Sequence, residues 1–226
     1  MNSYFNSMKP IFSLLLLGVV LLTACQSSKQ TEGAVPNIDG LEQALAQSTD
    51  PLERIDLKRQ IVDLTMEAAT PEERCRIFEE FATLVEEEEE YWQLLRDSEN
   101  IAPDACLVLT WRELGDLIAR YEAYAESNPE QKELFVRLSD NYQYLQMVYM
   151  TGTDNTPIAD ESGSIDPELK SEWQRFMKAY PNSLTSELIK DFLQLKNYGD
   201  TLPLQERVEE VQKTSNHPLL LASSFL

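Results

Sequence analysis

The chain contains few residues of the types that catalysis and metal binding use most often. Among its 226 residues are three cysteines and a single histidine, His217. One histidine cannot build a two-histidine metal site, and no Gly-x-Ser-x-Gly elbow accompanies it as in a hydrolase triad. The seven glycines form no phosphate-binding loop. We therefore predict no catalytic, cofactor-binding or metal-ligating residues, and we expect His217 to be an exposed residue near the C-terminus.

Acidic residues are abundant instead. The 39 Asp and Glu residues outnumber 19 Lys and Arg residues, which gives a net charge of −20. Such a surface repels nucleic acid and anionic lipid headgroups, so we expect no nucleic-acid partner. With so many carboxylates, acid–base pairs cannot be singled out from the sequence. The run Glu86–Glu90 could meet a basic partner or hold divalent cations, but runs of this kind usually solvate a helix face, which is our expectation here.

The first cysteine follows a segment with the layout of an export signal. Lys9 precedes a largely apolar run, Ile11–Ala24, which is shorter than the roughly 20 residues of a bilayer-spanning helix. The residues Leu22-Thr23-Ala24-Cys25 resemble the lipobox of bacterial lipoprotein precursors. The resemblance implies that residues 1–24 are a cleaved signal peptide and that the Cys25 thiol carries a diacylglycerol. The new amino group is then a site for a further acyl chain such as palmitate.

The same resemblance implies a location for the protein. An Asp after the lipidated cysteine favours the inner membrane in enterobacteria-like sorting, and here the residue is Gln26. We therefore expect a lipid-anchored protein of the cell envelope, at the outer membrane and facing the periplasm, whose membrane contact is the lipid on Cys25. Residues 25–36 are rich in Ser, Gln, Lys and Thr and predict a flexible tether before a domain of residues 37–226.

The domain carries repeated signals for helix starts. Proline suits the first helical turn, and a short polar residue before it can cap the free amides. Four dipeptides fit: Asp50-Pro51, Thr70-Pro71, Asn128-Pro129 and Asp166-Pro167. With further starts near residues 103, 184 and 203, they predict about seven helices. Thr70 with Glu73, and Asn128 with Gln131, also have the spacing of a capping box.

Apolar residues behind these starts recur with helical spacing. The clearest stripes are Leu107, Trp111, Leu114, Ile118, Tyr121 and Ala125, and then Phe135, Leu138, Tyr142, Leu145 and Tyr149. Since no segment alternates with period two, we predict an all-α domain, either a single helical bundle or an irregular repeat-like stack. The second alternative has support because Trp111-x-x-Leu114-Gly115 and residues 180–183 resemble fragments of tetratricopeptide repeats, helical hairpins that dock peptides and proteins. Residues 151–165 should form a solvated connector rather than a calcium loop.

Two further cysteines, Cys75 and Cys106, would lie in an oxidising compartment after export. A disulfide between them is possible only if the helix that starts at residue 71 does not continue straight to residue 95. Glu88 interrupts the apolar stripe of this segment, and we therefore predict a bend or a solvent-exposed face at residues 86–90 and an intramolecular disulfide. An intermolecular bridge and two free thiols are the alternatives.

These features favour a non-catalytic adaptor that holds a protein partner near the outer membrane, in envelope assembly or maintenance. An envelope enzyme, such as a carboxylate-based hydrolase of cell-wall polymers, is the alternative, and it would need a deep cleft with two facing acids. A carrier of small ligands would need an enclosed apolar cavity. The apolar C-terminal residues 219–226 should strap onto the helices or serve as a docking peptide.

Overall fold

The computed structural model describes residues 38–66, 69–84 and 88–222. The chain divides into two compact units, Met1–Pro36 and Asn37–Leu226, and the described residues lie in the second. The described part contains ten α-helices and one short hairpin of two strands. The helices are α1 Ile38–Gln47, α2 Pro51–Met66, α3 Pro71–Leu84, α4 Glu89–Asp97, α5 Trp111–Ser127, α6 Lys132–Thr151, α7 Pro167–Ala179, α8 Leu184–Phe192, α9 Thr201–Thr214 and α10 Pro218–Ala222.

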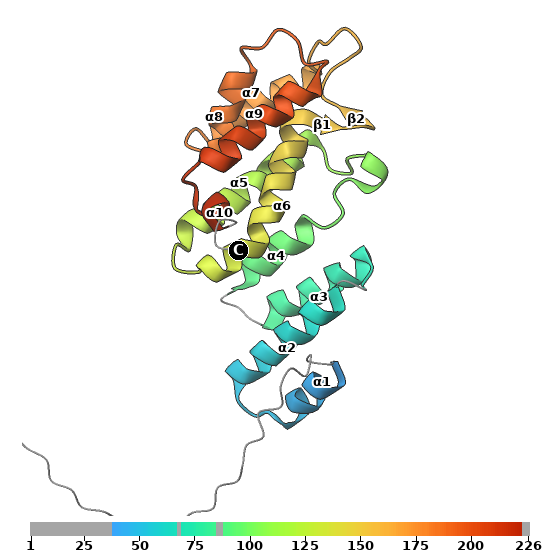
Figure 1. Ribbon diagram of the computed structural model, residues 1–226, viewed down its shortest axis with the longest axis vertical. Coiled ribbons are helices and arrows are strands. Elements are labelled where there is room, and N and C mark those ends of the chain that lie inside the picture. The colour runs from blue at the N-terminus through green and yellow to red at the C-terminus, as the bar shows by residue number, and fades with distance from the viewer. Residues whose placement is uncertain (1–37, 67–68, 85–87, 223–226) are drawn as a thin grey trace, which may run out of the picture. The chain divides into compact units, whose positions relative to one another are not determined.

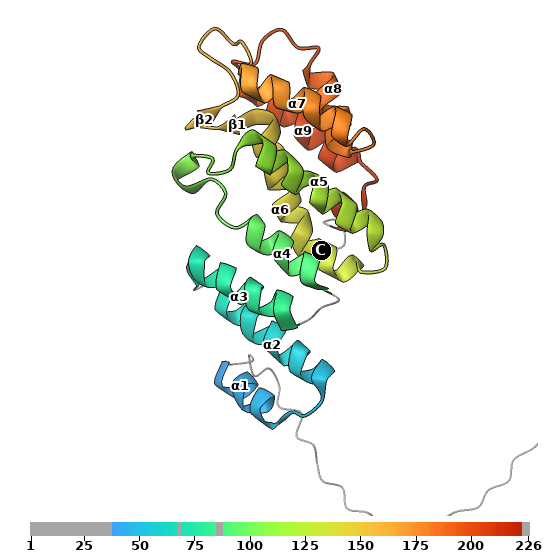
Figure 2. The ribbon, with the colours of Figure 1, turned by 180° about the vertical axis from the view of Figure 1, so that it is seen from behind.

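Consecutive helices pair and stack on one another. The sequential pairs α1 with α2, α3 with α4, α5 with α6 and α7 with α8 are in contact, and α4 joins the second pair to α5 (Figure 1). The chain then returns, because α9 (Figure 2) and α10 (Figure 1) pack on α6. The predicted all-α class is therefore confirmed, in the form of a stack of helical hairpins closed by a C-terminal return. No described helix is long and apolar enough to cross a bilayer.

Side-chain caps fix where several helices begin. Thr70 and Glu73 form the predicted reciprocal pair at the start of α3: the Thr70 amide donates to the Glu73 carboxylate at 2.8 Å, and the Glu73 amide donates to the Thr70 hydroxyl at 3.3 Å. Asp166 caps α7 by accepting from two amides of its first turn. Ser183 and Asp200 cap α8 and α9, each by accepting from one amide of the first turn. Each cap satisfies amides that the helix itself leaves unpaired.

Two predicted helix starts were wrong. Residues Pro103–Ala105 form a single 3₁₀ turn (η2) in which Asp104 and Ala105 have φ values of 50° and 56°, and this left-handed backbone cannot continue as a helix. The helix begins instead at Trp111, where Thr110 and Glu113 form a capping box. The second error is smaller: α6 begins at Lys132 rather than near residue 129, and Asn128 does not cap it.

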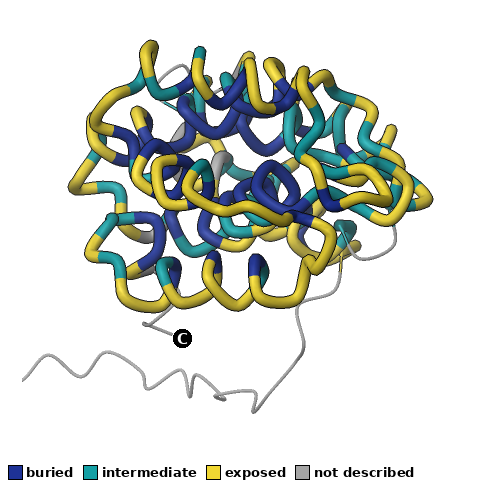
Figure 3. Tube along the Cα trace, turned by 90° about the horizontal axis from the view of Figure 1, so that it is seen from above, coloured by how far each residue is buried: buried dark blue, intermediate teal, exposed yellow. Residues whose placement is uncertain are grey.

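The predicted apolar stripes form the core. Leu114, Ile118 and Tyr121 of α5 are 0 % exposed, as are Leu138, Tyr142, Leu145 and Tyr149 of α6. Seen from above in Figure 3, the buried segments lie inside and the exposed turns lie around them. Burial of side chains of this size stabilises the fold by about 1.5–3 kcal/mol each. The same stripes therefore explain both why the segments are helical and which faces meet.

The polar segment after α6 interrupts the helices as predicted, but it is ordered by hydrogen bonds. Strands β1 Gly152–Thr153 and β2 Thr156–Pro157 form an antiparallel hairpin. Asp160 accepts hydrogen bonds from the amides of Ser162 and Ser164 in its own turn. Gly152 and Gly163 have φ values of 72° and 79°, which favour glycine. Ile158 is 1 % exposed, so this connector is anchored to the core.

Candidate functional site

The sequence-predicted lipidation residue, Cys25, lies outside the described residues. Its modification, the signal peptide of residues 1–24 and the tether of residues 25–36 therefore stay predictions. The described residues also contain no group of three or more His, Cys, Asp or Glu side chains placed to hold a metal ion.

The predicted disulfide is not formed, because Cys75 and Cys106 are free thiols. The predicted bend exists: α3 ends at Leu84 and α4 begins at Glu89, so the chain returns and brings the Arg96 carbonyl to 3.9 Å from the Cys75 sulfur. Beyond α4, however, the chain leaves Cys75. Ala105 accepts hydrogen bonds from Thr153 and Asn155 of the β-hairpin, and this holds the exposed Cys106 at a different part of the fold.

The acidic run that follows α3 pairs with other groups rather than only solvating a helix face. Glu88 forms an ion pair with Arg59 of α2 and accepts a hydrogen bond from the Trp92 indole at 3.1 Å. Glu90 pairs with Arg120 of α5 at 3.0 Å. These contacts compensate the placement of acids on an otherwise apolar stripe, which explains how the break in the stripe is tolerated. Glu86 and Glu87 lie outside the described residues.

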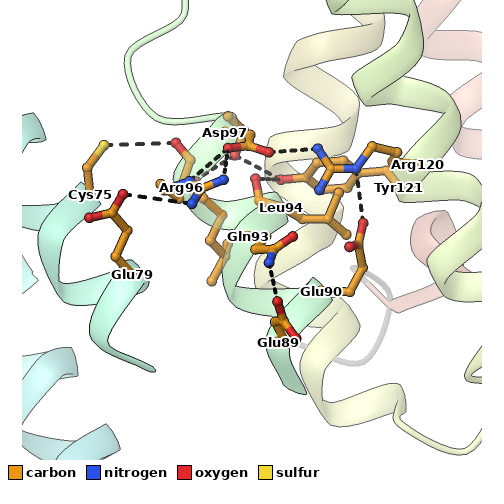
Figure 4. Close-up of polar contacts among 12 residues, drawn as sticks. Cys75, Glu79, Glu89, Glu90, Gln93, Leu94, Arg96, Asp97, Arg120 and Tyr121 are labelled. Atoms are coloured by element: carbon orange, nitrogen blue, oxygen red, sulfur yellow. Dashed lines mark hydrogen bonds and ion pairs between the residues drawn. The ribbon is translucent and has the colours of Figure 1, made fainter. Parts of the chain in front are cut away.

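Ion pairs continue from this run across three helices, as Figure 4 shows. Arg96 contacts Asp97 at 2.7 Å and Glu79 of α3 at 3.8 Å. Arg120 of α5 contacts the other oxygen of Asp97 at 2.6 Å. Because each Arg has carboxylate partners and the group joins α3, α4 and α5, we interpret this cluster as structural. Burial raises the pKa of the nearby Cys75 thiol, which disfavours its reactive thiolate form.

A buried polar network lies between α5, α6, α8 and α9. One carboxylate oxygen of Glu122 accepts hydrogen bonds from the Tyr142 hydroxyl at 2.7 Å and the Thr185 hydroxyl at 2.8 Å. Gln146 donates to both of these hydroxyls at 3.0 Å, and Gln212 of α9 donates to Gln146 at 3.0 Å. Burial and the neighbouring Glu122 charge raise the pKa of Tyr142 well above its ordinary value. The network fixes the relative register of four helices and keeps the phenol neutral.

A second buried carboxylate joins α5, α6 and α7. Glu172 is 7 % exposed and receives two hydrogen bonds of 2.7 Å from Arg175, which also donates to Asp116 of α5. The Tyr149 hydroxyl donates to Glu172 at 3.3 Å. Gly115 of α5 faces this contact and permits the close approach of the three helices. Because Glu172 and Asp116 both share Arg175, this arrangement suits packing rather than proton transfer.

A groove formed by α1, α2 and α3 has a volume of about 820 Å³. Its lining is mainly apolar, with charged side chains interspersed. The apolar residues are Ile38, Leu45, Ile61, Val62, Leu64, Ala69, Ile77 and Phe81, and the charged residues are Glu42, Lys58, Glu73, Arg76 and Glu80. Leu64 and Ile38 remain 38 % and 36 % exposed, so apolar surface is available to a partner.

The acids that line the groove are largely engaged in local contacts. Glu80 lies 3.5 Å from Lys58 of α2. Glu73 accepts from the Thr70 amide in the α3 cap, and these hydrogen bonds lower its pKa. The groove therefore offers apolar surface with a charged border rather than a pair of poised catalytic acids.

His217 is half-buried with its ring turned toward the core, and the expectation of an exposed tail histidine was wrong. Both ring nitrogens are buried, and the ring stacks on Tyr142 with 5.8 Å between centroids. The predicted strap is confirmed over α10, whose Leu219 and Leu220 are 0 % and 5 % exposed against α5 and α6. Residues 223–226 lie outside the description.

Sequence reasoning missed the groove and the two buried carboxylates. The groove depends on how three consecutive helices pack against one another, and no local pattern in the sequence indicates this. Glu122 and Glu172 had a usable signal, because each lies next to a large apolar residue, Tyr121 or Trp173, inside a predicted helix. With 39 acids in the chain, this signal was not distinctive. Comparisons of the chain with protein families, with curated proteins and with solved structures gave no match.

Proposed function

We propose that this chain is a lipid-anchored adaptor of the cell envelope, tethered through Cys25 at the outer membrane and docking a protein partner in the groove of α1, α2 and α3. The observation that carries the proposal is the groove itself, with its exposed Leu64 and Ile38. Apolar side chains left accessible within a concave surface are typical of protein-docking sites. The groove is also formed by the first three helices that follow the predicted tether along the chain.

The border of the groove suggests the chemistry of the partner. Three acids and two bases line it, and the whole chain has a net charge of −20. A partner segment with an apolar stripe flanked by Lys or Arg would complement both the apolar lining and the acidic charge. Opposite charges speed association and exclude acidic competitors. An amphipathic helix fits best, since it presents apolar side chains on one face in the manner of a helix in a groove.

Docking is favoured over the alternative of a cell-wall hydrolase. Glycoside hydrolysis needs two carboxylates that face each other across a substrate cleft. In the groove, Glu80 is paired with Lys58 and Glu73 is held in a helix cap. Glu122 and Glu126 border a smaller cavity of about 190 Å³, but one Glu122 oxygen is already held by Tyr142 and Thr185.

A site-specific photo-crosslinker at Ile38 in intact cells tests the docking surface. We expect it to capture a discrete protein, and we expect Leu64→Asp to abolish that capture because it places a charge in the groove. The matched control is Leu202→Asp, since Leu202 is an exposed apolar residue of α9 away from the groove lining. Equal capture in both variants, or capture of lipid alone, would contradict the proposal.

The anchor is tested separately by Cys25→Ser. We expect the variant to lose acyl mass and to leave the membrane fraction, because several acyl chains are what hold such a protein stably. Retention of the unacylated variant in the membrane would overturn the anchor without affecting the docking surface.

A further inference from the structure

His217 is enclosed at the junction of α9 and α10 without polar partners. Its Nδ1 and Nε2 atoms are both buried and make no hydrogen bond within the described residues. The ring lies nearly parallel to that of Tyr142, with an interplanar angle of 18°. A neutral imidazole presents one donor and one acceptor, whereas the protonated ring presents two donors and a charge. Protonation would therefore bury a charge together with a second N–H donor that has no hydrogen-bond acceptor, which is costly.

The backbone of His217 also starts α10. Its carbonyl accepts hydrogen bonds from the amides of Leu220 at 2.9 Å and Leu221 at 3.1 Å. Its own amide donates to the Ser215 hydroxyl at 3.1 Å. The helix has only five residues, and Leu219 and Leu220 are its buried contacts with the core. A displacement of His217 therefore removes the first turn of α10 and the alignment of these two leucines.

The charged groups that act on the imidazole are two carboxylates, and neither accepts a hydrogen bond from it. Glu122 and Glu126 of α5 attract a positive charge there, but burial outweighs them and lowers the pKa of His217. The described hydrogen bonds to Glu122 already come from Tyr142 and Thr185.

The other elements packed nearby contribute no free charge. Tyr142 of α6 is a neutral phenol, since burial and Glu122 raise its pKa. On α9 the nearest charged residue along the chain, Lys213, is exposed and pairs with Glu209 at 2.7 Å. A proton on His217 is therefore accommodated most easily by moving the ring out to water.

We propose that His217 is a pH-sensitive latch whose protonation releases α10 from α5 and α6. The direction in which pH changes the stability of the latch follows from proton linkage. Because the pKa of the enclosed imidazole lies below its ordinary value of 6.5, the latched state binds fewer protons than the released state. The latch is fully stable above about pH 6.5, the ordinary histidine pKa, and weakens as the pH falls below that value towards the lower pKa of the latched state.

Release would expose an apolar surface. Leu220 lines one side of a cavity of about 540 Å³ whose other walls include Tyr144 and Met147 of α6. Tyr144 is already 50 % exposed. Departure of α10 would remove the Leu220 wall of this cavity and leave Tyr144 and Met147 more exposed. Acidification would thus open a second contact surface, on helices other than those of the docking groove.

The latch can be tested by proton titration of the intact chain followed by NMR. His217 is the single histidine, so its imidazole resonances need no assignment by mutation. We expect a titration midpoint below 6.5. A midpoint at or above that value would overturn the proposal regardless of how any variant folds.

Hydrogen exchange supplies the structural readout. After correction for intrinsic exchange, we expect protection of the Leu220 and Leu221 amides to stay constant between pH 7.5 and 6.5. From pH 6.5 to 5.5 we expect it to fall by up to about tenfold per pH unit, the limit for one proton. The His217→Phe variant keeps a stacked ring of similar shape, but this ring cannot be protonated. Protection of the Leu220 and Leu221 amides in this variant should therefore not change with pH. The same loss of protection in this variant, or no loss in the wild-type protein, would refute the latch.

Discussion

Replacing Gly115 with alanine tests the contact of α5 with α6 and α7. A Cβ atom at this position would lie 2.9 Å from the Tyr149 hydroxyl oxygen and 3.0 Å from a Glu172 carboxylate oxygen. Neither neighbour can move easily, because Tyr149 is 0 % and Glu172 is 7 % exposed, and the two are hydrogen-bonded. The added methyl group must therefore displace a buried, polar contact.

The expected change in the free energy of unfolding of Gly115→Ala combines three effects. Alanine in place of glycine stabilises an unobstructed helix interior by about 1 kcal/mol. Overpacking of a close-packed core costs about 1–3 kcal/mol, and a hydrogen bond to a charged group contributes about 1.5–3 kcal/mol. Arg175 continues to compensate Glu172, so no charge is left unpaired. We expect Gly115→Ala to lower the free energy of unfolding by about 2 kcal/mol, because the steric and hydrogen-bond losses exceed the gain in helix propensity.

Urea unfolding followed by tryptophan fluorescence measures this change as a lower midpoint with an unchanged slope. Tyr149→Phe removes the closest obstructing atom, so the double variant should be less destabilised than the sum of the single variants by about 1 kcal/mol. Gly40→Ala is the matched control, because Gly40 is an exposed glycine of α1 and should not lose stability. A Gly115→Ala protein that unfolds at the same or a higher urea concentration than wild type would refute this account of the packing.

Three further outcomes are expected. Thr110→Ala removes the α5 cap and should lower the free energy of unfolding by about 1 kcal/mol, whereas Thr110→Ser should not; equal losses in urea unfolding would contradict the cap. Glu122→Ala leaves the buried hydroxyl donors of α6 and α8 unpaired and should lower the thermal midpoint further than Glu122→Gln, which keeps an acceptor oxygen. Alkylation without reductant, followed by intact mass, should label the exposed Cys106 before Cys75, whose thiol pKa is raised by burial; a protein that takes no label until it is reduced would show that a disulfide exists.

The sequence predicted much of the fold where the signal was local. The stripe from Phe135 to Tyr149 is buried in α6 as expected, and the cap at Thr70 starts α3. The helix start predicted at Pro103 was wrong because proline also suits a turn. The left-handed backbone of the next residue, Asp104, is not evident from its residue type. The competing signal, Thr110 followed three residues later by Glu113, was present in the sequence and marks the true start of α5.

The candidate site was much less predictable. The groove depends on where α1, α2 and α3 lie relative to one another, and its apolar residues are indistinguishable in sequence from core residues. The disulfide prediction correctly anticipated a bend after α3, but it could not anticipate that the β-hairpin binds the backbone of Ala105 beside Cys106. His217 was predicted to be exposed because it lies near the C-terminus. This position along the chain does not reveal that the C-terminal segment returns to the core.

By itself, the sequence determined the helical class, the faces of the main helices and the acidic surface, and it supplies the prediction of a lipid on Cys25. These properties depend on neighbouring residues, since a helix repeats every 3.6 residues and charge adds along the chain. Only the tertiary structure decided which side chains meet across helices: Glu122 with Thr185, Gly115 with Tyr149, and His217 with Tyr142. Such pairs join residues far apart in the chain, and they form because burial leaves each polar group only the partners that packing brings within reach.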